Sequence, residues 1–134
     1  MTGNIIMLID DDKTFNLLTS LVIKRYMADA NLQIYASALA ALEYIEANIG
    51  NVSALPVFIF LDIRMPQIDG FEFLEQLNSY DQEHIQNIRI AILTSSLNIA
   101  DQKKAFSYKQ VKYFLEKPLH LLKLKELDLG FDLS

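Results

Sequence analysis

The sequence predicts a doubly wound α/β fold in which five helices cover a five-stranded parallel sheet. Short apolar runs of strand length alternate along the chain with segments of helical period, as in βα units around a parallel sheet. The run from Val57 to Leu61 is apolar at every position, as expected of a central strand that helices cover on both faces. A length of 134 residues with 51% hydrophobic residues suits one compact domain.

Strand and helix segments follow from these patterns. We expect strands over residues 5–10, 32–37, 57–62, 89–95 and 113–116, and helices over residues 15–28, 38–49, 71–80, 100–108 and 119–129. Asp12, Ser37 and Asn98 each precede a helical segment and can cap it, and Asp69-Gly70 supplies a turn into the third helix. The polar segment 81–87 is expected to be a mobile connection on the side opposite the strand ends discussed next.

The strand order follows from topology. Right-handed crossovers and short connections favour the order 2-1-3-4-5, the flavodoxin-like arrangement. The first and third strands are then neighbours at the point where the order reverses. Ligands of open α/β sheets bind in the crevice beyond the carboxyl ends of such strands.

Three carboxylates are expected to meet in that crevice. Asp10 and Asp11 follow the first strand, and Asp62 follows the third. Carboxylates so close together repel one another, and protonation or a bound cation relieves the repulsion. Because these ligands are hard oxygens, we expect Mg²⁺ there, with Mn²⁺ as a possibility.

The other strand ends carry groups that suit a phosphoryl ligand. Thr94, at the end of the fourth strand, can donate a hydroxyl hydrogen bond, and Lys117, at the end of the fifth, can neutralise an oxygen as a compact charge. Asp62 has the chemistry of an aspartyl nucleophile. These residues therefore predict a site for a divalent cation and a phosphoryl group at the carboxyl edge of the sheet.

Composition excludes several classes of function. A net charge of −5 argues against direct binding of a nucleic acid, which needs clustered cations. The chain has no cysteine, so it has neither disulfides nor thiolate chemistry. No apolar stretch approaches the roughly 20 residues that span a bilayer, and no basic leader precedes the first apolar run. We expect a soluble cytoplasmic protein with no membrane contact.

These motifs together resemble the receiver domain of bacterial two-component response regulators. The resemblance runs from Ile5 to about Leu127, and all of the family's motifs occur in order: Asp10-Asp11-Asp12, Leu61-Asp62-Ile63-Arg64-Met65-Pro66, Asp69-Gly70, Thr94-Ser95-Ser96 and Lys117-Pro118. It implies that residues 1–134 form a single receiver domain with no output domain in this chain. It also implies a phosphoacceptor rather than an enzyme, with at most self-phosphorylation from small donors and autodephosphorylation.

The resemblance assigns the acidic residues their roles. Asp62 matches the phosphoaccepting aspartate, which takes phosphate from the phosphohistidine of a sensor histidine kinase or phosphotransfer protein. Asp10 and Asp11 match the acidic pair that binds Mg²⁺, Asp11 more directly and Asp10 largely through water. The backbone carbonyl of Arg64 matches the third protein ligand of the metal. Arg64 and Ser96 also occupy positions flanking the phosphoryl group, where the family varies.

It also assigns a conformational switch. Thr94 and Lys117 match the switch hydroxyl and the phosphate-contacting lysine, and Lys117-Pro118 matches the family's usual cis peptide bond. Phe114 falls at the aromatic switch position, where tyrosine is common. Phosphorylation would move Thr94 toward the phosphoryl group and turn Phe114 inward. A downstream protein target would then read the face formed by the helix over 100–108, the strand over 113–116 and the helix over 119–129.

Three alternatives are open at this level. A flavodoxin-like electron carrier shares the topology, but its first loop must cradle a phosphate, which Asp10 to Asp12 would repel. A haloacid-dehalogenase-like phosphatase needs a second aspartate at the position of Arg64. The nearest rival is a pseudo-receiver, a protein-binding module that keeps the fold without being phosphorylated.

Overall fold

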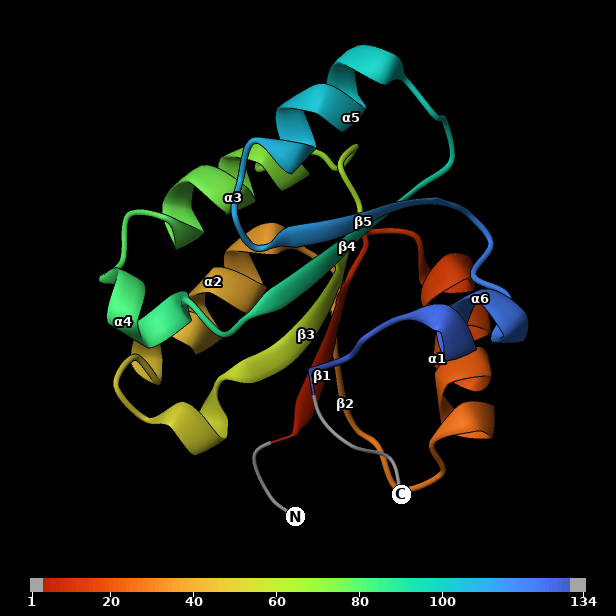
Figure 1. The fold of residues 1–134 in the computed structure, drawn as a ribbon, viewed down its shortest axis with the longest axis horizontal. Helices are drawn as coiled ribbons and strands as arrows, with labels where there is room; N and C mark the ends of the chain where they lie inside the picture. Colours follow the sequence, from red (N-terminus) through yellow and green to blue (C-terminus); the bar gives the residue numbers. More distant parts are fainter. Residues whose placement is uncertain (1–3, 131–134) are drawn as a thin grey trace.

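The computed structural model describes residues 4–130, which form a five-stranded parallel sheet between two layers of helices (Figure 1). The sheet has the order β2-β1-β3-β4-β5, as predicted. Its strands are β1 (Ile5–Ile9), β2 (Asn31–Tyr35), β3 (Pro56–Leu61), β4 (Arg89–Thr94) and β5 (Val111–Glu116). β1 and β3 are adjacent, with Ile9 in register with Leu61.

The helices divide between the two faces of the sheet. Figure 1 shows α1 (Lys13–Tyr26) and α6 (Leu121–Glu126) on one side. On the other side lie α2 (Ala38–Ala47), α3 (Gly70–Leu77), the single turn α4 (Gln82–Ile85) and α5 (Ile99–Phe106). A short 3-10 helix, η1 (Val52–Ala54), leads into β3.

The central strands are buried on both faces, and the side chains alternate between two cores. On β3, Ile59 and Leu61 pack toward the layer of α2 and α3, whereas Phe58 and Phe60 pack toward α1 and α6. All four side chains are fully buried. This two-residue alternation, with both faces covered, explains why the segment is apolar throughout.

Helix starts confirm the expected caps. Asp12, Ser37 and Asn98 each accept hydrogen bonds from backbone N–H groups of the first turn of α1, α2 and α5, respectively. Asp69 caps α3 in a reciprocal arrangement, in which the Glu72 carboxylate in turn accepts from the Asp69 backbone N–H. That second half of the capping box was not anticipated.

Two segments differ most from the prediction, and other bounds shift slightly: β5 begins at Val111 rather than at residue 113, and α3 ends at Leu77 rather than at residue 80. Residues 81–87, expected as a mobile connection, contain the single turn α4, so the described residues hold six α-helices rather than five. Ile85 is fully buried and anchors this turn, but one apolar residue in a polar stretch has no period to detect. The last helix runs from Leu121 to Glu126 rather than from residue 119 to residue 129, and it follows the cis peptide bond Lys117–Pro118. That bond has the expected isomer.

No helix within residues 4–130 is long and apolar enough to cross a membrane.

Gly70 brings α3 against the strand end that carries Asp62. A Cβ built on Gly70 would lie 2.6 Å from the carbonyl oxygen of Asp62 and 2.8 Å from the Cα of Ile63. Both neighbours are backbone atoms, which cannot move aside as a flexible side chain can. The backbone N–H of Gly70 also donates to the Ile63 carbonyl at 2.9 Å. Only glycine allows the helix to start this close to the site.

Gly70→Ala is therefore expected to lower the free energy of unfolding by about 1–3 kcal/mol, because the added methyl group forces backbone apart. Urea denaturation measures the change. The matched control is Ile99→Ala, which alters the first residue of α5, where the side chain is 74% exposed. We expect a change below about 0.5 kcal/mol there. Equal stability of Gly70→Ala and the native protein would contradict the close approach.

Candidate functional site

Two carboxylates meet because their strands are neighbours. Asp10 directly follows β1 and Asp62 directly follows β3, and the Asp62 backbone N–H donates to the Ile9 carbonyl at 3.0 Å. Both residues are buried, with 3% and 6% of their surface exposed. Asp11, the next residue after Asp10, is exposed, yet one carboxylate oxygen from each of the three aspartates lies within 4.8 Å of the others. The three acidic residues therefore gather at one edge of the sheet, as predicted.

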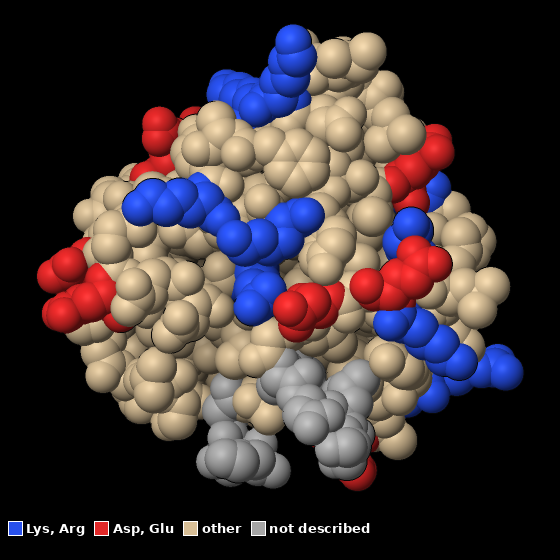
Figure 2. Space-filling view, viewed as in Figure 1, with Lys and Arg blue, Asp and Glu red and all other residues tan. Residues whose placement is uncertain are grey.

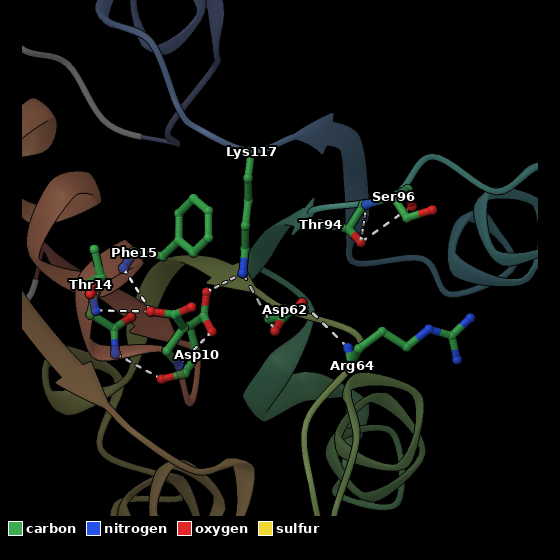
Figure 3. A network of polar contacts seen from close by, with 10 residues as sticks. Asp10, Thr14, Phe15, Asp62, Arg64, Thr94, Ser96 and Lys117 are labelled. Carbon is green, nitrogen blue, oxygen red and sulfur yellow. Dashed lines mark hydrogen bonds and ion pairs between the residues drawn. The ribbon is translucent and has the colours of Figure 1, made fainter.

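Lys117 reaches this acidic cluster from the end of β5. Its Nζ lies 2.6 Å from Oδ2 of Asp10 and 3.6 Å from Oδ2 of Asp62. The Lys117 side chain is only 5% exposed, and its backbone N–H donates to the Thr94 carbonyl at 2.7 Å. Figure 3 shows the ammonium between the two carboxylates, with the Phe15 ring beside it. The distance from Nζ to the ring centroid is 4.5 Å, which places the cation within reach of a cation–π interaction.

The cluster perturbs the protonation of Asp62. Burial, and then the negative charge of Asp10, raise the pKa of the Asp62 carboxyl from 3.8 to about 6. The Lys117 ammonium and the hydrogen bond from the Arg64 backbone N–H oppose this rise but do not cancel it. For the pKa of Asp62, burial and the neighbouring carboxylate therefore outweigh the ammonium of Lys117.

Thr94 lies at the end of β4, next to the strand that carries Asp62. It is 3% exposed, and its hydroxyl oxygen accepts from the Ser96 backbone N–H at 3.3 Å. In Figure 3 the Thr94–Ser96 pair lies beside the cluster, on the side toward Arg64. The Thr94 hydroxyl is therefore hydrogen-bonded to Ser96 in its own loop, although β4 is adjacent to β3, the strand that leads to Asp62.

Arg64 and Phe114 occupy the remaining predicted positions. The Arg64 backbone N–H donates to Oδ1 of Asp62 at 3.3 Å, so this loop folds back on the carboxylate. The Arg64 guanidinium points away from the carboxylate (Figure 3) and pairs with Asp101 on α5. Phe114, on β5, is half-buried and packs against the core on the α2 and α3 side of the sheet.

Three contributors were not anticipated from the sequence. Asn16 on α1 donates its side-chain amide to the Asp10 carbonyl at 2.7 Å and so braces the loop after β1. Phe15 forms the apolar wall beside Lys117, and Asp101 holds the Arg64 guanidinium. Asn16 is a local candidate because it lies six residues after Asp10, whereas the contacts of Phe15 and Asp101 join segments distant in the chain.

The donor set fits a hard divalent cation. Asp10, Asp11 and Asp62 offer three carboxylates, and this cluster contains no histidine or cysteine. Mg²⁺ and Mn²⁺ prefer such oxygen ligands, and Mg²⁺ commonly binds one or two carboxylates while keeping several waters. Exposed Asp11 leaves the cluster open to solvent on one side, which suits an ion that keeps its waters.

Comparison with known proteins gives concordant results. Residues 6–127 match the family described as "Response regulator receiver domain". A probable methanogenesis regulatory protein of Methanothrix harundinacea, FilR2, is 31% identical over 121 residues, covering 90% of this chain and 76% of that protein. The response regulator Rcp1 of Synechocystis is 28% identical, covering 96% of this chain and 86% of that protein.

Solved structures agree with the sequence relatives. A two-component response regulator from Cytophaga hutchinsonii superposes with a TM-score of 0.82 at 29% identity, covering 93% of each chain. The Mn²⁺-bound form of Rcp1 superposes with a TM-score of 0.72 at 28% identity, covering 90% of this chain and 86% of that one.

The flavodoxin-like carrier and the haloacid-dehalogenase-like phosphatase are thereby set aside. The family match spans nearly all of the sheet and includes each strand end of the site. The chain belongs to the response regulator receiver domain family of two-component signalling, whose members are phosphoacceptors rather than catalytic enzymes.

Proposed function

We propose that this protein is a phosphorylatable receiver that accepts a phosphoryl group on Asp62 from the phosphohistidine of a sensor histidine kinase or phosphotransfer protein, and that it acts in the cytoplasm. One observation carries the proposal. The Asp62 carboxylate is buried beside a lysine ammonium and two further carboxylates, at the strand end where the family's phosphoacceptor lies. Buried acidic groups in this arrangement suit a site that receives both a cation and a phosphoryl group.

The chemistry is a transfer between two nucleophiles. An oxygen of Asp62 attacks phosphorus, the P–N bond of phosphohistidine breaks, and the leaving imidazole nitrogen takes up a proton. The product is an acyl phosphate on Asp62. Lys117 can neutralise one phosphoryl oxygen, because its Nζ already lies 3.6 Å from the accepting carboxylate.

Asp10, Asp11, Asp62 and the backbone carbonyl of Arg64 would hold Mg²⁺, or Mn²⁺ in its place. When bound, such a cation offsets the negative charge that develops on the phosphoryl oxygens. Support comes from the donor chemistry of the cluster and from the Mn²⁺-bound relative Rcp1. Asn16 and the cap of α1 keep the loop that carries Asp10 and Asp11 in place.

Phosphorylation would be read out through Thr94 and Phe114. A phosphoryl group on Asp62 offers the Thr94 hydroxyl a stronger acceptor than the Ser96 carbonyl, to which the hydroxyl now donates at 3.4 Å. Movement of Thr94 opens space for Phe114, which is half-buried on β5. Phosphorylation then shifts the population between two arrangements of this region.

The face formed by α5, β5 and α6 would bind the downstream protein. It exposes three large apolar side chains, Ile99, Phe106 and Leu122, with 74%, 46% and 75% of their surface accessible. Figure 2 shows separate groups of basic and acidic side chains on a mostly uncharged surface, with α5 at the top and β5 in the middle as in Figure 1. Exposed apolar side chains of this size can contribute to a surface that binds another protein.

Incubation with Mg²⁺ and acetyl phosphate is expected to add one phosphoryl group, detected by intact mass measurement. Asp62→Asn should show no gain, because the amide is not nucleophilic. Asp81→Asn, which removes an exposed carboxylate before α4 at the other end of the sheet, should phosphorylate like the native protein. No gain in the native protein would favour the pseudo-receiver alternative.

Mg²⁺ is expected to raise the unfolding temperature of the native protein, because the ion binds the folded cluster and not the unfolded chain. Asp11→Asn should reduce the rise, which differential scanning calorimetry measures. Asp12→Asn is the matched control, since asparagine caps a helix as well as aspartate and Asp12 lies outside the cluster. An equal loss in both variants would show that the effect is general electrostatics rather than ligation.

Without metal, the raised pKa of Asp62 makes stability depend on pH. Between about pH 4 and 6 the folded protein keeps a proton on Asp62 that the unfolded chain has released, so the free energy of unfolding falls as pH rises through this range. Asp62→Asn lacks this loss and is expected to be more stable than the native protein at pH 7 by roughly 1–3 kcal/mol. Urea denaturation from pH 5 to 7.5 tests the difference. Parallel profiles for the two proteins would contradict the perturbed pKa.

A further inference from the structure

The Arg64 side chain links the loop after β3 to α5. Its guanidinium forms an ion pair with the carboxylate of Asp101, a residue 37 positions further along the chain. Asp101 lies in the first turn of α5. The backbone N–H of Asp101 donates to the side-chain oxygen of Asn98, the residue that caps this helix, at 3.1 Å. The pair therefore connects the site's own loop to the helix that borders the proposed output face.

The same residue already touches the phosphoacceptor through its backbone. The Arg64 N–H donates to Oδ1 of Asp62 at 3.3 Å, so the base of the side chain lies next to the carboxylate. The side chain is long and 64% exposed, so most of it lies outside the core. The guanidinium can therefore leave Asp101 and turn back toward Asp62 without any movement of the sheet.

The Arg64 guanidinium is expected to bind whichever of two anionic partners carries more negative charge: the Asp101 carboxylate or a phosphoryl group on Asp62. Asp101 offers a single negative charge, and its side chain is 18% exposed. A phosphoryl group carries about 1.5 to 2 negative charges and several acceptor oxygens, and the planar guanidinium can donate to two of them at once. A phosphoryl group on Asp62 is thus the stronger ligand for Arg64.

We propose that Arg64 is a phosphoryl-binding residue that Asp101 holds in reserve until Asp62 is phosphorylated. The inference rests on the proposed function, since it needs a phosphoryl group on Asp62. On phosphorylation the guanidinium exchanges Asp101 for phosphoryl oxygens, and the link between the loop and α5 opens.

Release of Asp101 does not unravel α5. Its carboxylate stays in the first turn, where the helix dipole favours a negative charge, and the Asn98 cap remains in place. What α5 loses is its tether to the phosphoacceptor loop. The exchange therefore couples Asp62 to the output face by a route separate from Thr94 and Phe114.

Affinity for beryllofluoride tests the exchange, because this phosphoryl mimic binds an aspartate oxygen in the presence of Mg²⁺. Isothermal titration would compare the native protein, Asp101→Asn, Arg64→Gln and the double variant. Asp101→Asn frees the guanidinium and is expected to tighten binding about two- to fivefold, the range of an exposed ion pair. Arg64→Gln removes the ligand and should weaken binding about tenfold. In the Arg64→Gln background, Asp101→Asn should change nothing, because its effect passes through Arg64.

Arg89→Gln and Asp128→Asn are the matched controls. They break a second exposed ion pair, 3.2 Å long, that lies outside the cluster, and should leave the affinity unchanged. The inference is overturned if Asp101→Asn leaves affinity unchanged, or if it has the same effect with and without Arg64. Failure of the native protein to bind beryllofluoride would instead overturn the proposed function. Thermal unfolding of each variant verifies that it is folded.

Discussion

A buried ammonium shared by two carboxylates is the interaction around which the site is organised. Lys117, Asp10 and Asp62 each have side chains less than a tenth exposed, and they come from the ends of three different strands. Burying such charges is costly unless they are paired, so the three strand ends must be held in one arrangement. Asp11 belongs to the same cluster, so the Lys117 ammonium is accompanied by three carboxylates. Burial, and then the negative charge of Asp10, raise the pKa of Asp62, and the three carboxylates together suit a divalent cation.

The fold separates the fixed part of the site from the part that can respond. Asp10 and Asp62 continue from strands buried on both faces, and Gly70 sets α3 in contact with the backbone beneath Asp62. Arg64 lies two residues beyond Asp62, yet its side chain is mostly exposed and is held by one ion pair. Asp62, the proposed phosphoacceptor, thus follows a buried strand and lies next to an exposed side chain, Arg64, that can change its partner. Local chemistry on Asp62 can thus change the surface without disturbing the core.

Two routes are proposed from Asp62 to the face formed by α5, β5 and α6. One runs through the end of β4 to β5, where Thr94 and Phe114 lie on adjacent strands. The other runs through Arg64 and Asp101 to the first turn of α5. Both routes use polar contacts that a phosphoryl group can outcompete.

The sequence by itself determined the order of the elements, their approximate bounds and the chemistry at each strand end. The alternation of periods, the uniformly apolar run of β3 and the caps at Asp12, Ser37 and Asn98 are local signals, readable without knowledge of neighbours. The convergence of Asp10 and Asp62 also followed, because strand order alone makes the two strand ends adjacent. Only the tertiary structure decided that Lys117 lies nearer to Asp10 than to Asp62, that Asp101 holds Arg64, and that Ile85 anchors an additional turn. Those features depend on side-chain distances between segments far apart in the chain, and periodicity and propensity carry no information about such distances.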